Sequence, residues 1–140
     1  MPVRVETRGR SRALQALYAW DVRQDDSALE RIAGLVWDDL SVPADERAFA
    51  GALVRIIALE QAAIDSELAE VTTNWRLERL GHIERCVLRL AAAELLQAGT
   101  PPRVVIQEAV RLAERYGSSK SARFVNGVLD ALARRTGQLT

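Results

Sequence analysis

The sequence predicts an all-α fold, a single domain of two packed three-helix sub-bundles. The chain of 140 residues is 49% hydrophobic but only 5% aromatic, and it is rich in alanine, leucine and arginine, residues that favour helices. Apolar residues recur at the i, i+3, i+4, i+7 spacing of amphipathic helices along most of the chain. Proline and glycine residues stand where these apolar stripes begin and end, so the helix boundaries can be placed.

Three helices are predicted in the first half of the chain. The first covers about 10–23, and the second runs to Leu40 after Ser27, a residue typical of helix N-caps. Pro43 is placed to open a third, long helix over roughly 44–71. Each of these segments carries an apolar stripe of helical period, so each is expected to bury one face.

Three further helices are predicted in the second half. The helical pattern breaks at 72–74, and a short turn through Leu80 follows. The helices then predicted cover about 82–98, 102–116 and 119–135. Gly99 and Gly117 end the first two of them, and Thr100 is the expected N-cap of the second. We expect the sub-bundles, about 1–71 and 75–140, to pack as one domain because neither is long enough to be stable alone.

No sequence pattern indicates a membrane segment or an exported protein. The longest apolar stretches fall short of the ~18–20 residues that a membrane span needs. Charged residues near the N-terminus are not followed by the apolar block of a signal peptide. We therefore expect a soluble, cytoplasmic protein.

Catalytic and metal-binding patterns are also missing. The one cysteine, Cys86, and the one histidine, His82, allow neither an internal disulfide nor a metal site between them. Cys86 lies among apolar residues, which predicts a packed thiol. Glu94 falls on the inner stripe of its helix, and since a buried carboxylate needs a partner, we expect an ion pair rather than acid–base chemistry. The sequence therefore predicts a non-catalytic protein without a cofactor or a metal.

Charge is segregated along the chain, although 19 bases balance 19 acids overall. Residues 1–24 hold five bases against two acids, residues 25–70 three against eleven, and residues 71–140 eleven against six. A fold that brings the two basic ends together would concentrate positive potential on one side. Arginine supplies 18 of the 19 bases, so arginine content alone does not identify a nucleic-acid-binding protein.

Arginines alternate at the start of the first helix, at Arg8, Arg10 and Arg12. Cations at this end of a helix oppose its dipole, so they are not there to stabilise the helix. Guanidinium groups beside helix N–H groups favour an anion such as phosphate. An anion-binding arm and a solvated, disordered tail are both consistent with these residues.

The last helix contains an Asn-Gly pair, which is ordinarily a turn signal, without losing its apolar stripe. Lys120, Arg123 and Gly127 share one helical face, where a bare glycine would let a nucleic-acid backbone come close. Phe124 and Tyr18 flank apolar stripes, where aromatic rings can stack on unpaired bases. The alternative is that Gly127 admits a neighbouring helix and Phe124 only closes the core.

Four sequence blocks stand in order along the chain. They are RALQALY at 12–18, VLRL with ELL at 87–96, VIQEAVRLA at 105–113 and FVNGVLD at 124–130. Together they resemble the NusB family of transcription antitermination factors over nearly the whole chain. The similarity is weakest over 25–70, where only the helical pattern agrees.

The resemblance implies the same fold and a non-catalytic, RNA-binding role. NusB-like proteins bind the single-stranded boxA element of nascent ribosomal RNA together with NusE, a small-subunit ribosomal protein. The pair helps RNA polymerase resist termination and supports ribosomal RNA maturation. The RNA-side residues that the resemblance implies are Arg8, Arg10, Arg12, Tyr18, Glu84, Arg89, Arg123 and Phe124. The family often has an acid where this chain has Lys120. A base there is expected to favour phosphate contact, unless this position serves the protein partner instead.

Two other classes of function remain open from the sequence. A helical module that binds proteins but not RNA would use the acidic segment 25–70 as its surface. The fold also resembles the N-terminal domain of certain ribosomal RNA cytosine methyltransferases, but this chain has no room for their catalytic domain. The sequence leaves open whether the protein is a monomer or a homodimer.

Overall fold

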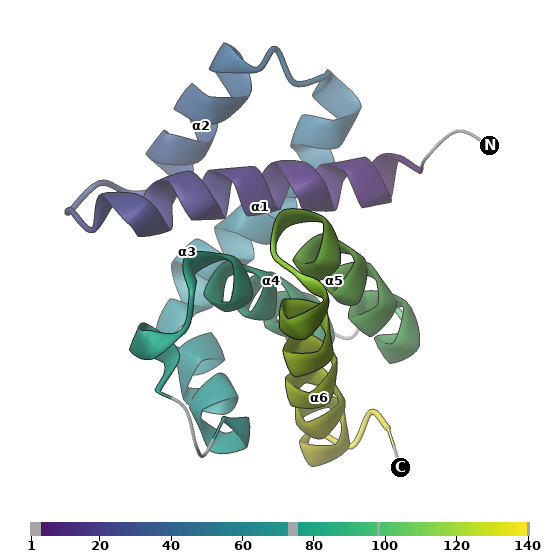
Figure 1. Cartoon of the computed structure of the whole chain (residues 1–140). Coiled ribbons are helices and arrows are strands. Elements are labelled where there is room, and N and C mark those ends of the chain that lie inside the picture. Colours follow the sequence, from purple (N-terminus) through teal and green to yellow (C-terminus); the bar gives the residue numbers. More distant parts are fainter. Residues whose placement is uncertain (1–3, 73–75, 98, 140) are drawn as a thin grey trace.

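The computed structural model describes residues 4–72, 76–97 and 99–139, which form six α-helices and one short 3₁₀ turn (Figure 1). The elements are α1 (Val5–Arg23), α2 (Leu29–Asp39), α3 (Ala44–Val71), η1 (Leu77–Arg79), α4 (His82–Gln97), α5 (Pro102–Tyr116) and α6 (Ser119–Arg135). No strand occurs in this part of the chain, and the predicted all-α fold class is confirmed.

The first two helices begin at other residues than predicted. Helix α1 begins at Val5 rather than near residue 10, so the N-terminal arginines lie within it. Helix α2 begins at Leu29 after Ala28, and the predicted N-cap at Ser27 is wrong. The carbonyl oxygen of Ser27 instead accepts a hydrogen bond from the Trp20 indole at 3.0 Å, which ties this turn to α1.

The later helix boundaries are close to the predicted ones. Pro101 takes the N-cap position of α5 that was expected for Thr100. Ser118 caps α6, because its hydroxyl oxygen accepts a hydrogen bond from the backbone N–H of Ser121 at 3.1 Å. Two predicted boundaries, at 73–74 and at Ala98, lie outside the described residues.

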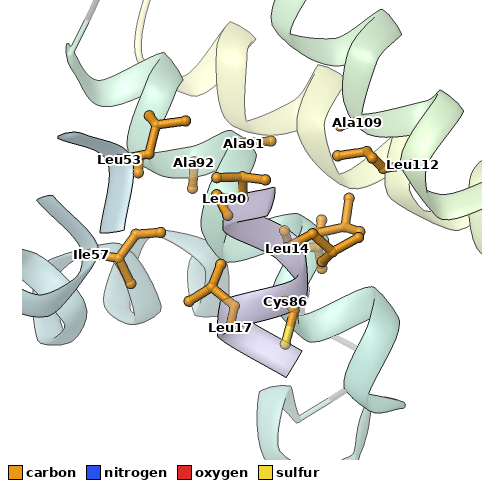
Figure 2. Packing of buried hydrophobic residues seen from close by; sticks show 14 of the residues in the cluster. Leu14, Leu17, Leu53, Ile57, Cys86, Leu90, Ala91, Ala92, Ala109 and Leu112 are labelled. Atoms are coloured by element: carbon orange, nitrogen blue, oxygen red, sulfur yellow. The ribbon is translucent and has the colours of Figure 1, made fainter. Parts of the chain in front are cut away.

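Helix α4 is the centre of the core. Every residue from Arg85 to Leu95 is buried, and the helix contacts α1, α3, α5 and α6. Figure 2 shows apolar side chains from α1, α3 and α5 meeting around it. Cys86 lies inside this core, where burial raises the pKa of its thiol to about 12. The prediction of a packed thiol is therefore confirmed.

Helix α3 contacts helices from both halves of the chain. It contacts α1 and α2 as well as α4 and α6, and it is kinked at Glu60, whose backbone angles (φ −115°, ψ 20°) are not helical. In Figure 1, α2 lies on one side of α1, and α5 and α6 lie on the other. The division into sub-bundles of about 1–71 and 75–140 stays a prediction. None of the described helices is long and apolar enough to cross a membrane.

Candidate nucleic-acid interface

Arg8 and Arg12 lie on the same side of α1, one helical turn apart, and both contact Glu46 in the first turn of α3. Nε of Arg8 is 2.9 Å from one carboxylate oxygen of Glu46, and Nε of Arg12 is 3.0 Å from the other. The side chains of Arg8 and Arg12 are 40% and 28% exposed, whereas that of Glu46 is 7% exposed. The alternative of a solvated tail is wrong for the described residues, since this segment is a helix held against α3.

Arg10 points the other way, into the protein. Its Nε and Nη2 donate to the two oxygens of Glu94 on α4 at 2.6 and 2.8 Å, and Nη1 lies 3.4 Å from Glu108 on α5. Burial alone would lower the pKa of Arg10, but the hydrogen bonds and the charge of Glu94 raise it. The ion pair predicted for Glu94 is confirmed. The predicted RNA contact of Arg10 does not fit its position, because only 5% of the side chain is exposed.

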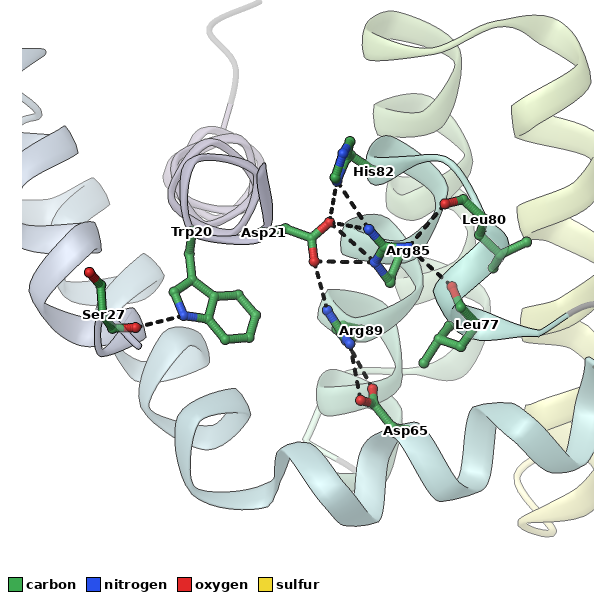
Figure 3. A network of polar contacts seen from close by, with 9 residues as sticks. All are labelled: Trp20, Asp21, Ser27, Asp65, Leu77, Leu80, His82, Arg85 and Arg89. Atoms are coloured by element: carbon green, nitrogen blue, oxygen red, sulfur yellow. Dashed lines mark hydrogen bonds and ion pairs between the residues drawn. The ribbon is translucent and has the colours of Figure 1, made fainter. Parts of the chain in front are cut away.

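Arg89 is also held inside the protein, as Figure 3 shows. Its Nε and Nη2 donate to the carboxylate of Asp65 on α3 at 2.9 and 3.0 Å, and Nη1 donates to Asp21 on α1 at 3.2 Å. The guanidinium thus joins three helices. We therefore correct the prediction that Arg89 contacts RNA. Its side chain is buried and holds α4 against α1 and α3.

Asp21 is the centre of this polar network (Figure 3). Its carboxylate accepts from Arg85 Nη2 at 2.6 Å, and one of its oxygens lies 2.5 Å from His82 Nδ1. Burial alone would raise the pKa of Asp21, but the hydrogen bonds from Arg85 and His82 hold it below its usual value. The network fixes the second half of α1 on the start of α4.

The lowered pKa of Asp21 predicts a loss of stability in acid. Because the folded-state pKa lies below the unfolded one, this stabilisation is present above the unfolded pKa and is lost as the pH falls through the folded pKa. We expect the difference in unfolding free energy between the wild type and Asp21→Asn to shrink between about pH 5 and pH 2. Urea denaturation followed by circular dichroism measures this difference. Asp130→Asn, which removes an exposed carboxylate from α6, is the matched control, and a difference that stays constant with pH would contradict the assignment.

Tyr18 projects from α1 beside His82. The two rings meet edge to face, with centroids 5.9 Å apart and planes at 78°. Since Asp21 holds the imidazole, His82 in turn gives a fixed neighbour to Tyr18, which is 42% exposed. Tyr18, an aromatic position predicted from the sequence, is therefore accessible to solvent and held in place by its contact with His82.

The start of α6 lies against the start of α4. The hydroxyl of Ser121 donates to Glu84 at 2.5 Å, so the carboxylate of Glu84 is engaged within the protein. Lys120 and Arg123 beside it are exposed, and neither forms an ion pair with any described residue. Phe124 is half-buried at the edge of the core. Glu84 thus joins α4 to a helix start that carries two outward-facing bases.

Gly127 lies on the exposed surface of α6, one turn beyond Arg123. A Cβ built at this position would meet no atom within 4 Å. The alternative that this glycine admits a neighbouring helix is therefore wrong, and the backbone of α6 is open to solvent here.

The family model described as the NusB family matches residues 7–134. The chain belongs to the NusB family. The transcription antitermination protein NusB of Anaeromyxobacter dehalogenans strain 2CP-1 is 46% identical over 130 residues, which cover 91% of this chain and 89% of the relative. Such NusB relatives are antitermination proteins and not enzymes.

Solved NusB structures share the fold. The structure of T. maritima NusB is similar with a TM-score of 0.84 and 34% identity, covering 96% of this chain and 93% of that one. A structure of the antitermination factors NusB and NusE in complex with double-stranded RNA has a TM-score of 0.83 and 31% identity, covering 96% of this chain and 99% of that one.

In this NusB-family chain, the acidic middle segment supplies partners for the basic ends. The pairs are Arg8 and Arg12 with Glu46, Arg89 with Asp65, and Arg135 with Glu67. Sequence reasoning missed Glu46 and Asp21 as parts of the site. The acidic excess over 25–70 indicated that carboxylates such as Glu46 were available, but Asp21 lies outside that segment. Among the described residues, no three His, Cys, Asp or Glu side chains gather as a metal site would require.

Proposed function

We propose that this chain is a non-catalytic transcription antitermination factor that binds boxA-type single-stranded RNA of ribosomal transcripts together with NusE. Its role would be to support processive transcription by the RNA polymerase antitermination complex and maturation of ribosomal RNA, which places it in the cytoplasm. The observation that carries the proposal is that both α1 and α6 present basic side chains to solvent, together with an accessible tyrosine on α1 and an open glycine on α6. A similar protein bound to NusE and RNA supports it.

Four cations that are partly or fully exposed make up the phosphate-binding part of this proposal, two from each helix. They are Arg8, Arg12, Lys120 and Arg123. Four neutralised phosphates on a single strand correspond to a slope of log affinity against log salt of about −3. Tyr18 and Phe124 would add base stacking, worth roughly 1–3 kcal/mol for each base. Arg10, Glu84 and Arg89 would act indirectly, by holding the helices that present these groups.

A titration of labelled RNA tests the proposal. Fluorescence anisotropy is measured with a boxA oligomer, a scrambled oligomer and a duplex form of boxA, each over a salt series with and without NusE. We expect the single-stranded boxA oligomer to bind most tightly, with a salt slope near −3. Equal binding of the scrambled oligomer in the presence of NusE would overturn the proposal. Analytical ultracentrifugation of the same samples shows whether the protein is a monomer or a homodimer.

The two other functions considered from the sequence lose support. A protein-binding module was to use the acidic segment 25–70, but Glu46, Asp65 and Glu67 in that segment form ion pairs with arginines. The methyltransferase hypothesis loses support because the similarity to the Anaeromyxobacter NusB extends over 89% of that antitermination protein's length.

Gly127→Ala is expected to stabilise the protein and to weaken RNA binding. Alanine is favoured over glycine in a helix interior by about 1 kcal/mol, and the added methyl group meets no protein atom within 4 Å. The same methyl group would obstruct an RNA backbone that comes close to α6. Thermal unfolding and RNA anisotropy measure the two effects.

Gly34→Ala is the matched control for this prediction. Gly34 also lies inside a helix, α2, and a Cβ there also meets no atom within 4 Å. We expect the same stabilisation without a change in RNA affinity. If Gly127→Ala binds RNA as tightly as Gly34→Ala, the RNA backbone does not approach this glycine.

A further inference from the structure

We propose that Glu46 is a positioning residue for RNA binding, which holds the guanidinium groups of Arg8 and Arg12 together so that they receive neighbouring phosphates. The proposal rests on the RNA-binding function proposed above. It assigns a role in ligand binding to a carboxylate that would itself repel RNA.

The geometry makes Glu46 a bridge between the two arginines. Each of its oxygens contacts a different one, through Nε in both cases, at 2.9 and 3.0 Å. A guanidinium has five N–H donors in a rigid fork, so it can hold a carboxylate through Nε and a phosphate through its terminal amino groups at once. The bridge is built into the fold, because Glu46 is in the first turn of α3 and its side chain is almost fully buried.

The bridge also accounts for an arrangement that is otherwise unfavourable. Arg8 and Arg12 are like charges four residues apart on one helix, a spacing at which they repel each other. Arg8 also lies at the end of the first turn of α1, where a cation opposes the helix dipole. A carboxylate between them offsets both effects and keeps two long side chains in one place.

The direction in which a substitution of Glu46 changes the RNA affinity separates a positioning role from a simple effect of charge. If only charge mattered, removing a carboxylate beside the RNA site would tighten binding. If Glu46 orders the arginines, its removal weakens binding, because RNA must then immobilise two flexible side chains. The cost of ordering two such side chains corresponds to about a tenfold loss of affinity.

The test compares Glu46→Ala and Glu46→Gln with Glu6→Gln, which removes one charge from the exposed start of α1, the helix that carries Arg8 and Arg12. Affinity for the single-stranded boxA oligomer is measured with NusE over a salt series, and thermal unfolding is recorded for each variant. We expect Glu46→Ala to bind about tenfold more weakly. We expect Glu46→Gln to be intermediate, because its amide oxygen still accepts a hydrogen bond, and Glu6→Gln to bind at least as tightly as the wild type. The salt slope should stay the same in all of them, since no cation is removed.

The outcomes separate this inference from the function on which it rests. If the wild type does not prefer boxA over the scrambled oligomer, the proposed function fails. If the wild type binds boxA but Glu46→Ala binds equally or more tightly, the positioning role is overturned and Glu46 is only a structural or a competing group. If Glu46→Ala does not fold, Glu46→Gln decides, and binding by that variant at wild-type affinity overturns the inference.

Discussion

Replacing Glu94 with alanine is expected to lower the free energy of unfolding by about 3–5 kcal/mol. The substitution leaves Arg10 charged in the interior, where only 5% of its side chain is exposed. The remaining carboxylate near it, Glu108, is 3.4 Å away and contacts a single amino group, so it does not replace the two short hydrogen bonds to Glu94. Urea denaturation followed by circular dichroism measures the loss.

Two variants control this prediction. The double variant Arg10→Met with Glu94→Met removes both charges, and we expect it to recover most of the lost stability, because apolar side chains of similar size can replace a buried ion pair. Asp130→Ala removes one member of an exposed pair on α6, and a change of only about 0.3–0.5 kcal/mol is expected. A loss below about 1 kcal/mol for Glu94→Ala would contradict the importance of the buried pair.

Replacing Arg8 and Arg12 together with alanine is expected to weaken boxA binding by roughly a hundredfold, since each charge-assisted contact contributes about 1.5 kcal/mol. Losing two phosphate contacts should also reduce the salt slope by about 1.4. Fluorescence anisotropy over a salt series measures both quantities. Thermal unfolding should also shift to lower temperature, because the substitution leaves the carboxylate of Glu46, which is 7% exposed, without these two ion-pair partners.

The matched control for the arginine pair is Arg31→Ala with Arg55→Ala. These two arginines are exposed on α2 and α3, and their removal changes the net charge by the same amount. We expect the salt slope to stay close to that of the wild type. If this control flattens the slope as much as the Arg8 and Arg12 substitutions do, the RNA is held by net charge and not by the start of α1.

The helices were largely predictable from the sequence, because apolar period and proline or glycine punctuation act locally. The bounds of α3 and α6 are those predicted, at 44–71 and 119–135. The start of α1 was predicted too far along the chain, because arginines are unfavourable in the first turns of a helix. Ion pairs of these arginines with Glu46 and Glu94 stabilise them there. Tertiary contacts override local preference there.

The candidate site was only partly predictable. Tyr18, Lys120 and Arg123 are exposed as expected, but Arg10 is not. A helix turns by about 100° per residue, so Arg10 faces away from Arg8 and Arg12 once all three lie in one helix. This could have been deduced only if the helix had been predicted to begin before the arginines.

The partners of the buried charges required the fold itself. Glu94 was expected to need a partner, and Arg10 stands 84 positions away in the sequence. Asp65 and Arg89 are 24 positions apart, and Asp65 lies in the segment where only the helical pattern agrees with the family. Pairings of this kind follow from how α1 and α3 pack on α4, and periodicity does not specify that packing.

The proposed RNA site consists of accessible groups on α1 and at the start of α6. Nuclear magnetic resonance spectra of the ¹⁵N-labelled protein, recorded as boxA RNA is added, test it most directly. We expect the amide shifts to concentrate at Arg8, Arg12, Tyr18 and residues 120–127, including the well-separated amide of Gly127. Shifts that concentrate on α2 and around the exposed Leu59 of α3, with Gly127 unchanged, would contradict it.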